Sequence, residues 1–277
     1  NTTRTQLTMN LFTVTFEEDL ERSLIQAQSI EKFVTNSYNY YIFINELDDV
    51  YERLRHHFKP FNCTILSRAD LPNYTYPDYG WESQQLIKFA MVDYFKEDYL
   101  ILDSKIFFTK PTDTNIFKGL GGNSLVPINR YDIQKAAEIY ALILKKPVPS
   151  HYLSMWPFYV DVKPFENIDI NSLQNDLFGK FTPFEYVYYS VLCGEDYVNT
   201  NIGSNENRCL RVTTQEQFDI IDRWPDFHCM FFKPDLLTKE QMEIACNYVN
   251  NIGIDVELKQ AICREVSTFI LNPVDKK

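Results

Sequence analysis

Glycine is scarce in this sequence. Of 277 residues, 8 are glycine, where average usage of about 7% predicts roughly 19. Common phosphate-binding loops need several glycines, because their backbone approaches the phosphate closely, and neither G-x-G-x-x-G nor G-x-x-x-x-G-K-S/T occurs. The scarcity therefore argues against a nucleotide site that is built on a glycine-rich loop.

Positive charge and long apolar runs are also in short supply. Lys and Arg total 27 against 38 Asp and Glu, which gives a formal net charge of −11. A general nucleic-acid-binding protein needs an excess of cations to displace phosphate counterions, so we expect no nucleic-acid partner. No uncharged apolar run reaches the length of about 18 residues that a transmembrane helix needs, so we expect no transmembrane segment.

Closely spaced cysteine pairs are absent as well. None of the six cysteines forms a C-x-x-C pair, which argues against a zinc ribbon or a thioredoxin-type site. Cysteines scattered this widely in a chain of this length are typical of reduced thiols in a reducing compartment. We therefore expect a cytoplasmic location. The cysteines are Cys63, Cys193, Cys209, Cys229, Cys246 and Cys263.

Strand-like and helix-like patterns alternate over the first hundred residues. Apolar or β-rich runs at 11–15, 40–44, 63–66 and 99–102 predict strands; helical spacing predicts helices over 20–34, 47–57 and 80–95. Thr15-Phe16-Glu17-Glu18 fits a capping box at the start of the first helix. Continuous apolar strands between helices predict an α/β fold with a mostly parallel sheet that is flanked by helices. Such sheets bind ligands beyond the carboxyl ends of their strands.

The second half of the sequence is less regular. Helical patterns and strand-like pieces alternate there with several prolines, which predicts an irregular α+β elaboration of the same sheet. The expected helices are 130–145, 170–178, 184–193, 238–251 and 255–270, and the expected strands are 123–127, 156–162, 209–213 and 228–232.

Asp103-Ser104-Lys105 is the most informative segment. Asp103 ends a buried apolar strand, where an α/β sheet places its functional residues. Two interpretations are open. The carboxylate caps the following turn, or it contacts a sugar, a ribose or a metal-bridged diphosphate.

The helix expected over 80–95 carries a second candidate site. Trp81, Gln84, Gln85 and Lys88 are spaced i, i+3, i+4 and i+7, so they share one helix face. An aromatic ring, two amides and an ammonium suit the recognition of hydroxyl and phosphate groups. A plain solvated face would favour Glu and Lys instead.

Two further residues are candidates with a structural alternative. Glu185 opens a helix just after Pro183, so it is either a catalytic or acceptor-binding carboxylate or a charge that stabilises the helix N-terminus. His228 begins an apolar run, where a single histidine is either a ligand or a hydrogen-bonded structural residue.

The order of these motifs resembles an uncharacterised bacterial and viral family of glycosyltransferase-like proteins that have the GT-A nucleotide-sugar-binding fold. The pairing of a G-W-x-x-Q-Q-x-x-K helix with a following Y-L-x-L-D-S strand end is the most specific part, and the similarity covers roughly residues 11–192. The matching stretches are TVTFEEDLERSLIQAQSIEKFV (13–34), YIFINELDDVYERL (41–54), YGWESQQLIKFAMVDYFKEDYLILDSK (79–105) and FTPFEYVYYSVL (181–192).

The resemblance implies a D-x-D-like metal site, from which this sequence departs. In such enzymes the two carboxylates hold a divalent ion that bridges the donor diphosphate, whereas a lysine stands here at the second position, Lys105. A protonated lysine does not bind a metal. Three alternatives follow. Lys105 replaces the metal; Asp103 keeps a Mn²⁺ or Mg²⁺ ion together with a downstream residue such as His228 or Glu185; or the site has lost its chemistry.

The resemblance also implies an activity and a domain organisation. The expected activity is transfer of a sugar from a nucleotide-sugar donor to a glycan or other hydroxyl acceptor, in a bacterial cell or a virus-infected host. The alternative is an inactive sugar- or nucleotide-binding or structural protein of a larger assembly. The chain is expected to form one GT-A-like domain, residues 1–277, with a nucleotide-binding half (1–110) and an acceptor-side elaboration that includes the C-terminal helices (111–277).

The resemblance assigns expected roles to individual residues. Asp103 and Glu185 are the expected catalytic residues, with Glu185 orienting or deprotonating the acceptor. Asp103 and His228 are the candidate metal ligands. The expected donor-binding residues are Thr13, Thr15, Trp81, Gln84, Gln85, Lys88 and Lys105. The sequence sets neither the donor base and sugar nor the oligomeric state.

Overall fold

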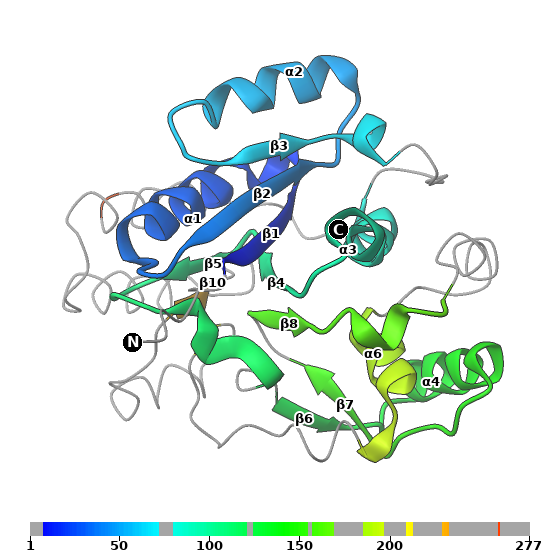
Figure 1. Ribbon diagram of the computed structural model, residues 1–277. Helices are drawn as coiled ribbons and strands as arrows, with labels where there is room; N and C mark the ends of the chain where they lie inside the picture. Colours follow the sequence, from blue (N-terminus) through cyan, green and yellow to red (C-terminus); the bar gives the residue numbers. More distant parts are fainter. Residues whose placement is uncertain are drawn as a thin grey trace, which may run out of the picture.

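The computed structural model of the chain describes residues 8–71, 80–120, 124–154, 157–168, 185–196, 209–212 and 229–232, together with Gln260. The helices expected over 170–178 and 238–251, and all but Gln260 of the helix expected over 255–270, lie outside these residues. Within them, the expected α/β arrangement with a mostly parallel sheet is confirmed (Figure 1).

The central sheet has the strand order β3-β2-β1-β4-β8. The first four of these strands run parallel, and β8 is antiparallel to β4. The order reverses between β1 and β4, because β2 and β3 extend to one side of β1 and β4 lies on the other. The strands are β1 (Met9–Thr15), β2 (Tyr38–Ile44), β3 (Thr64–Leu66), β4 (Tyr99–Asp103) and β8 (Phe158–Val160).

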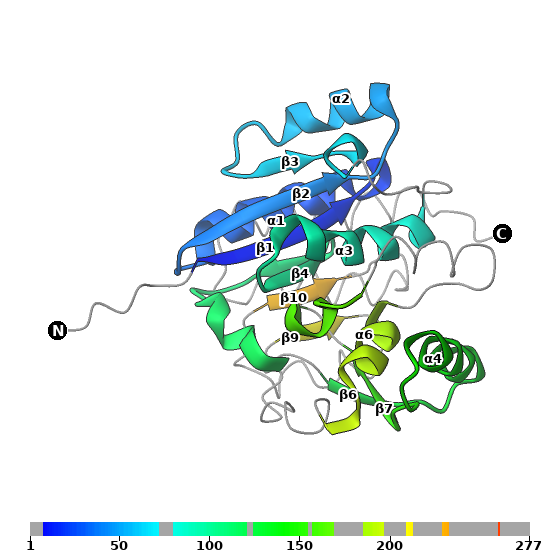
Figure 2. The ribbon, with the colours of Figure 1, turned by 45° about the vertical axis from the view of Figure 1, so that its right-hand side comes forward.

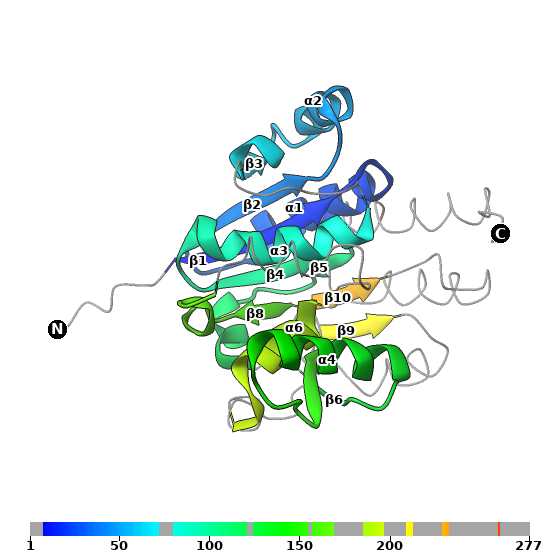
Figure 3. The same ribbon diagram turned by 90° about the vertical axis from the view of Figure 1, so that its right-hand side faces the viewer.

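Helices cover both faces of this sheet, and alternate strand residues divide between them (Figures 2 and 3). On β4, Leu100 and Leu102 pack with α1 and α2, whereas Tyr99 and Ile101 pack with α3, α4 and α6. Burial of both faces explains why the strands read as continuous apolar runs. The helices are α1 (Leu20–Phe33), α2 (Asp48–His57), α3 (Trp81–Phe95), α4 (Tyr131–Leu144) and α6 (Glu185–Cys193).

Two smaller sheets extend the molecule. One has the order β5-β10-β9, in which β10 is antiparallel to β5 and parallel to β9. The other pairs β6 with β7, antiparallel. The sequence pattern did not predict β5 or β7, whose runs of three and four residues are too short to stand out. These strands are β5 (Ile106–Phe108), β6 (Ser124–Pro127), β7 (His151–Ser154), β9 (Cys209–Val212) and β10 (Cys229–Phe232).

The capping box expected at Thr15 is wrong. A short 3-10 segment, η1 (Glu17–Asp19), precedes α1, and its N-cap is Phe16, whose side chain makes no cap. The backbone N–H of Glu17 donates instead to Glu46 Oε1 at 2.9 Å. Thr15 still belongs to β1, and its hydroxyl lies 2.6 Å from the hydroxyl of Ser23 in α1. The alternation of the strand turns Thr15 toward α1, and its hydroxyl donates to the Phe16 carbonyl at 3.4 Å, so it does not cap the next turn.

Gly80 is one glycine whose conformation matters. It is the N-cap of α3 with φ of 129°, a value that side-chain-bearing residues rarely adopt. Its carbonyl accepts a hydrogen bond from the hydroxyl of Ser83. Gly80 therefore sets where α3 begins and so where its side chains meet the sheet.

Among the described residues, no helix is long and apolar enough to cross a membrane. Cys63, Cys193 and Cys229 are free thiols. Burial raises the pKa of the Cys63 thiol to about 11, so this thiol is protonated at neutral pH.

Candidate functional site

The candidate site lies at the carboxyl edge of the parallel strands, where the strand order reverses. Asp103 ends β4 and stands opposite Val14 of β1 in the sheet register. Ser104 and Lys105 form the turn that leads into β5. In open α/β sheets, the carboxyl edge at such a reversal is the usual place for a ligand. The structure therefore confirms that Asp103 is the last residue of a buried strand, as the sequence predicts.

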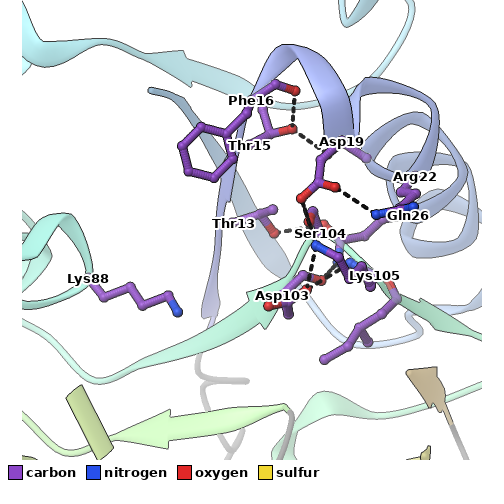
Figure 4. Close-up of polar contacts among 12 residues, drawn as sticks. Thr13, Thr15, Phe16, Asp19, Arg22, Gln26, Lys88, Asp103, Ser104 and Lys105 are labelled. Atoms are coloured by element: carbon purple, nitrogen blue, oxygen red, sulfur yellow. Dashed lines mark hydrogen bonds and ion pairs between the residues drawn. The ribbon is translucent and has the colours of Figure 1, made fainter. Parts of the chain in front are cut away.

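Lys105 lies between two carboxylates (Figure 4). Its ammonium donates to Asp19 Oδ2 at 2.7 Å and lies 3.7 Å from Asp103 Oδ1. The Lys105 backbone N–H donates to the same Asp103 oxygen at 3.1 Å, and the Ser104 hydroxyl donates to Asp19 Oδ2 at 2.6 Å. The D-x-D-like turn thus folds back onto the residue that precedes α1.

Asp19 is a site residue that the sequence did not reveal. It is the last residue of η1, it is buried, and its second oxygen accepts a hydrogen bond from Arg22 Nη1 at 2.9 Å. Its neighbours Glu17 and Glu18 are equally acidic but exposed. The only sequence signal was the i, i+3 spacing of Asp19 and Arg22, which many exposed helix pairs share.

The charges in this cluster stabilise one another. Burial by itself raises the pKa of Asp19, but the Lys105 ammonium, the Ser104 hydroxyl and Arg22 overcome it and lower the pKa from its usual 3.8. Burial likewise lowers the pKa of Lys105, but Asp103 and Asp19 raise it above the usual 10.5. Asp19 is therefore ionised, and Lys105 protonated, at neutral pH.

This donor set does not fit a divalent cation. Both oxygens of Asp19 accept hydrogen bonds from cationic groups, and the Lys105 ammonium lies where an ion shared by Asp19 and Asp103 would have to bind. Within the described part of the chain, His, Cys, Asp and Glu form no group of three or more that could hold a metal. His228, the other candidate ligand, lies outside the described residues.

A buried amide holds the strand end in place. Gln26 of α1 donates from Nε2 to the carbonyls of Asp103 at 2.6 Å and of Ile106 at 2.8 Å. Its Oε1 accepts hydrogen bonds from the hydroxyls of Thr13 at 2.7 Å and Tyr40 at 2.8 Å. One side chain therefore connects β1, β2, β4 and β5 to α1, and it fixes the turn that carries Lys105.

Thr13 and Thr15, two expected donor-binding residues, face α1. Both are fully buried, and their hydroxyls bond to Gln26 and Ser23 respectively. The structure thus brings them close to the strand end, as expected, but it turns their side chains into the layer between sheet and helix.

The polar face of α3 is mostly buried. Trp81 is 47% exposed, whereas Gln84, Gln85 and Lys88 are 7%, 1% and 2% exposed. Gln85 Nε2 donates to the Trp81 carbonyl, and its Oε1 is buried with no hydrogen-bond partner. The sequence placed these residues together correctly but did not show that three of them are buried or that Lys88 meets Glu185 of α6.

Lys88 and Glu185, which the sequence suggested separately, form a buried ion pair. Lys88 Nζ lies 2.8 Å from Glu185 Oε1, and the two side chains are 2% and 6% exposed. A cavity of about 10 Å³ beside the pair has room for roughly one water molecule. Its other lining residues are Phe89, Tyr99, Ile101, Phe158, Val160, Phe165 and Tyr189.

The buried pair and Asp103 belong to the same face of the sheet. Side chains alternate along a strand, so Tyr99, Ile101 and Asp103 of β4 point to one face, and the first two line the cavity of Lys88 and Glu185. Two residues of strand span about 6.6 Å, so the pair lies a short way below the sheet edge. In Figure 4, Lys88 stands apart from the cluster around Lys105.

Comparison with known proteins agrees with this fold. The sequence model of a group described as "Family of unknown function (DUF6492)" matches residues 5–140. Among solved structures, the apo structure of WbbM, a bifunctional glycosyltransferase, has a TM-score of 0.51 and 11% sequence identity. That match covers 92% of this chain and 51% of the WbbM chain, so the chain spans about half the length of WbbM.

Two structures of LgtC also match. An active-site mutant of LgtC has a TM-score of 0.48 with 11% identity and covers 92% of this chain. The galactosyltransferase LgtC in complex with donor and acceptor sugar analogues has a TM-score of 0.46 with 12% identity and covers 91%. Both matches span the whole LgtC chain. A search of curated proteins finds no match. Together with the sheet topology, the match to WbbM shows that the chain has a GT-A glycosyltransferase fold.

Proposed function

We propose that the chain is a glycosyltransferase, which moves a sugar from a nucleotide-sugar donor to a glycan or other hydroxyl acceptor. The observation that carries this proposal is the Asp103-Ser104-Lys105 turn, which lies at the carboxyl edge of a GT-A-type sheet where the strand order reverses. A carboxylate and an ammonium at this edge suit the hydroxyls and the phosphates of such a donor.

The proposed reaction exchanges one bond for another. The oxygen of the acceptor hydroxyl forms a bond to the anomeric carbon of the sugar, and the bond from that carbon to the diphosphate oxygen breaks. The hydroxyl proton passes to a carboxylate or to water, and the nucleoside diphosphate leaves with the bonding electron pair. The protein must therefore stabilise negative charge on the departing diphosphate and receive a proton on the acceptor side.

In this proposal, Asp103 binds a donor hydroxyl and Lys105 offsets the diphosphate charge. The exposed ring of Trp81 lies at the start of α3 and offers an apolar surface for the sugar or the base. Glu185 orients or deprotonates the acceptor. Because the bond to Lys88 engages the buried Glu185 carboxylate, that role requires the pair to separate when substrate binds.

A second candidate function is that of an inactive binding or structural protein. The observation that favours it is the pairing of the candidate charges with one another, Lys105 with Asp19 and Lys88 with Glu185. Charges that satisfy one another inside the protein stabilise a shape without needing a substrate. Such a protein would keep the fold and a sugar- or nucleotide-binding surface but transfer nothing.

Release of nucleoside diphosphate from a panel of nucleotide sugars tests the proposal. The full chain is incubated with each donor, with a mixture of glycan acceptors, and with Mn²⁺, Mg²⁺ or a chelator. At least one donor is expected to be consumed, and Lys105→Ala is expected to lower the rate by about tenfold or more, because the leaving group loses a charged hydrogen bond. Lys59→Ala, which removes an exposed lysine after α2, is the matched control.

The assays with Mn²⁺, with Mg²⁺ and with chelator distinguish a site in which Lys105 replaces the metal from a site that binds a metal ion. Turnover in chelator supports Lys105 as the substitute for a metal, whereas turnover that needs Mn²⁺ or Mg²⁺ supports an ion at Asp103 and His228. A panel in which no donor is consumed, but one donor raises the melting temperature, supports the inactive binding protein. Neither turnover nor any thermal shift contradicts a nucleotide-sugar site altogether.

A further inference from the structure

Four residues of opposite charge meet around Asp19 in the described part of the chain. They are the carboxylates Asp19 and Asp103 and the cations Arg22 and Lys105, and the formal charges of these four sum to zero. Two carboxylates that share one divalent ion have the same sum. The two side-chain cations therefore supply the charge that a metal would bring to a pair of acids.

The two cations are neighbours across one carboxylate. Asp19 Oδ1 accepts from Arg22 Nη1 at 2.9 Å, and Oδ2 accepts from Lys105 Nζ at 2.7 Å. A guanidinium has five N–H donors in a planar fork, and an ammonium has three, so a bond to Asp19 is compatible with a further anionic partner for each. Asp19 thus holds an Arg and a Lys side by side at the sheet edge.

The degree of burial separates this cluster from the other ion pairs. The Arg22, Asp19, Asp103 and Lys105 side chains are between 10% and 16% exposed. The Lys88–Glu185 pair is nearly inaccessible, and the Arg130–Asp132 pair lies open to solvent. Side chains at this intermediate level keep part of their surface in contact with solvent, yet their charges are screened less than they would be in water.

We propose that Arg22 and Lys105 together bind the diphosphate of the donor, and that this pair takes the place of a divalent metal. The inference rests on the proposed function, and it adds Arg22 to the site and commits the site to binding without metal. The first turn of α1 supports it, because a helix N-terminus favours an anion and Arg22 is the third residue of that helix.

The pair would act as the sugar leaves. When the bond from the anomeric carbon to the diphosphate oxygen breaks, the departing group gains negative charge. Two cations that are already in place stabilise that charge without having to reorganise. Asp103 keeps Lys105 at the strand end through the 3.7 Å contact, and so it sets the position of the ammonium relative to the sugar.

Titration calorimetry with inorganic pyrophosphate, in the presence of a chelator, tests the pair directly. The full chain is expected to bind pyrophosphate, and Arg22→Ala and Lys105→Ala are each expected to weaken binding roughly tenfold to a hundredfold, since each loses charged hydrogen bonds. Arg55→Ala is the matched control, because Arg55 forms an i, i+3 pair with Glu52 at 3.0 Å on the exposed surface of α2. Arg22→Gln is the second variant if Arg22→Ala does not fold, as judged by circular dichroism.

A charge-reversing variant gives an independent readout. Lys105→Asp restores the second carboxylate of a D-x-D motif, so its binding of pyrophosphate is expected to become dependent on Mn²⁺, whereas that of the unchanged chain is not. Metal-dependent binding by the unchanged chain, or equal affinity of the Arg22→Ala and Arg55→Ala variants, overturns the inference.

Failure of this inference is distinguishable from failure of the proposed function. If a nucleotide sugar is turned over only with metal, and Arg22→Ala has no effect, the glycosyltransferase proposal is supported and the two-cation site is contradicted. Metal-free pyrophosphate binding that depends on both residues, without turnover of any donor, supports the two-cation site and contradicts the transferase.

Discussion

At the scale of single residues, Asp19 holds the candidate site together. Its carboxylate touches the Lys105 ammonium, the Ser104 hydroxyl and the Arg22 guanidinium. Without the Asp19 carboxylate, the cations Arg22 and Lys105 stay close together, and of the four charged residues of the cluster only Asp103 is left to offset them. Since a buried charge without its partner is costly, the residue should matter for stability as well as for the ligand.

Asp19→Asn is therefore expected to lower the free energy of unfolding by about 2 kcal/mol at neutral pH. The pKa of Asp19 is lowered on folding, so its contribution to stability is present above the usual value of 3.8 and is lost as the pH falls through the lower folded value. The difference between the two chains should shrink accordingly below pH 3.8. Urea denaturation at a series of pH values measures it.

Glu18→Gln provides the control for this prediction. Glu18 lies in the same turn but is exposed, and its replacement should change stability by no more than about 0.5 kcal/mol. A constant difference between Asp19→Asn and the unchanged chain down to the most acid pH would show that the loss comes from packing and not from charge.

How much of the site the sequence predicts depends on the distance between partners along the chain. Asp103 and Lys105 were predictable because they end an apolar strand. Asp19 and Gln26 were not, because their partners lie 86 and 77 residues away in the sequence. No local pattern distinguishes an acid that will meet a distant lysine from an acid that caps a helix.

At the scale of elements, the buried pair of Lys88 and Glu185 joins α3 to α6. The two residues are 97 positions apart, and apolar and aromatic side chains surround them. In many proteins, replacing both partners of a buried ion pair with hydrophobic residues leaves the free energy of unfolding unchanged or raises it. The 2.8 Å bond between Lys88 Nζ and Glu185 Oε1 links the two helices at one buried point.

Removal of one partner should cost far more than removal of both. Lys88→Met is expected to destabilise the chain by about 3–5 kcal/mol, because it leaves the Glu185 charge buried, and Lys88→Met/Glu185→Leu is expected to recover most of that loss. Denaturant titration of the single and double variants measures the coupling. Arg130→Met, which breaks an exposed pair with Asp132, should change stability by less than about 1 kcal/mol. Additive effects of the single variants would contradict coupling through the pair.

Elements with strong local patterns were predictable, and elements defined by distant pairing were not. β1, β2 and β4 appear as apolar runs because their side chains are covered on both sheet faces. β5 has three residues, and β10 pairs with it across 120 intervening positions, which no periodicity reveals. The polar face of α3 was also predictable, but the contact of Lys88 with Glu185 of α6 was not, because the two residues lie 97 positions apart.

At the scale of the whole molecule, the net negative charge disfavours the approach of an anionic donor to the candidate site. The chain carries a formal charge of −11, so it repels an anionic donor at long range, while the candidate cations attract it at short range. Salt screens the first effect more than the second, because partly buried charges are screened less than exposed ones.

The rate at which a nucleoside diphosphate associates is therefore expected to rise, by up to about threefold, between about 0.02 and 0.2 M salt. The affinity should change little over the same range. Stopped-flow fluorescence with a labelled nucleotide measures both quantities, with an uncharged nucleoside as the control. A steep fall in rate with added salt would indicate a broad basic surface, which the composition argues against.

The pairing of β10 with β5 also sets an order of events during synthesis. β1 to β4 can associate once residue 103 has left the ribosome, but β5 acquires its partner only when residues 229–232 emerge. Until then, the backbone groups of β5 that pair with β10 lack that partner, and unpaired strand edges invite association with other chains. More than a hundred residues are therefore translated after β5 before β10 can pair with this edge.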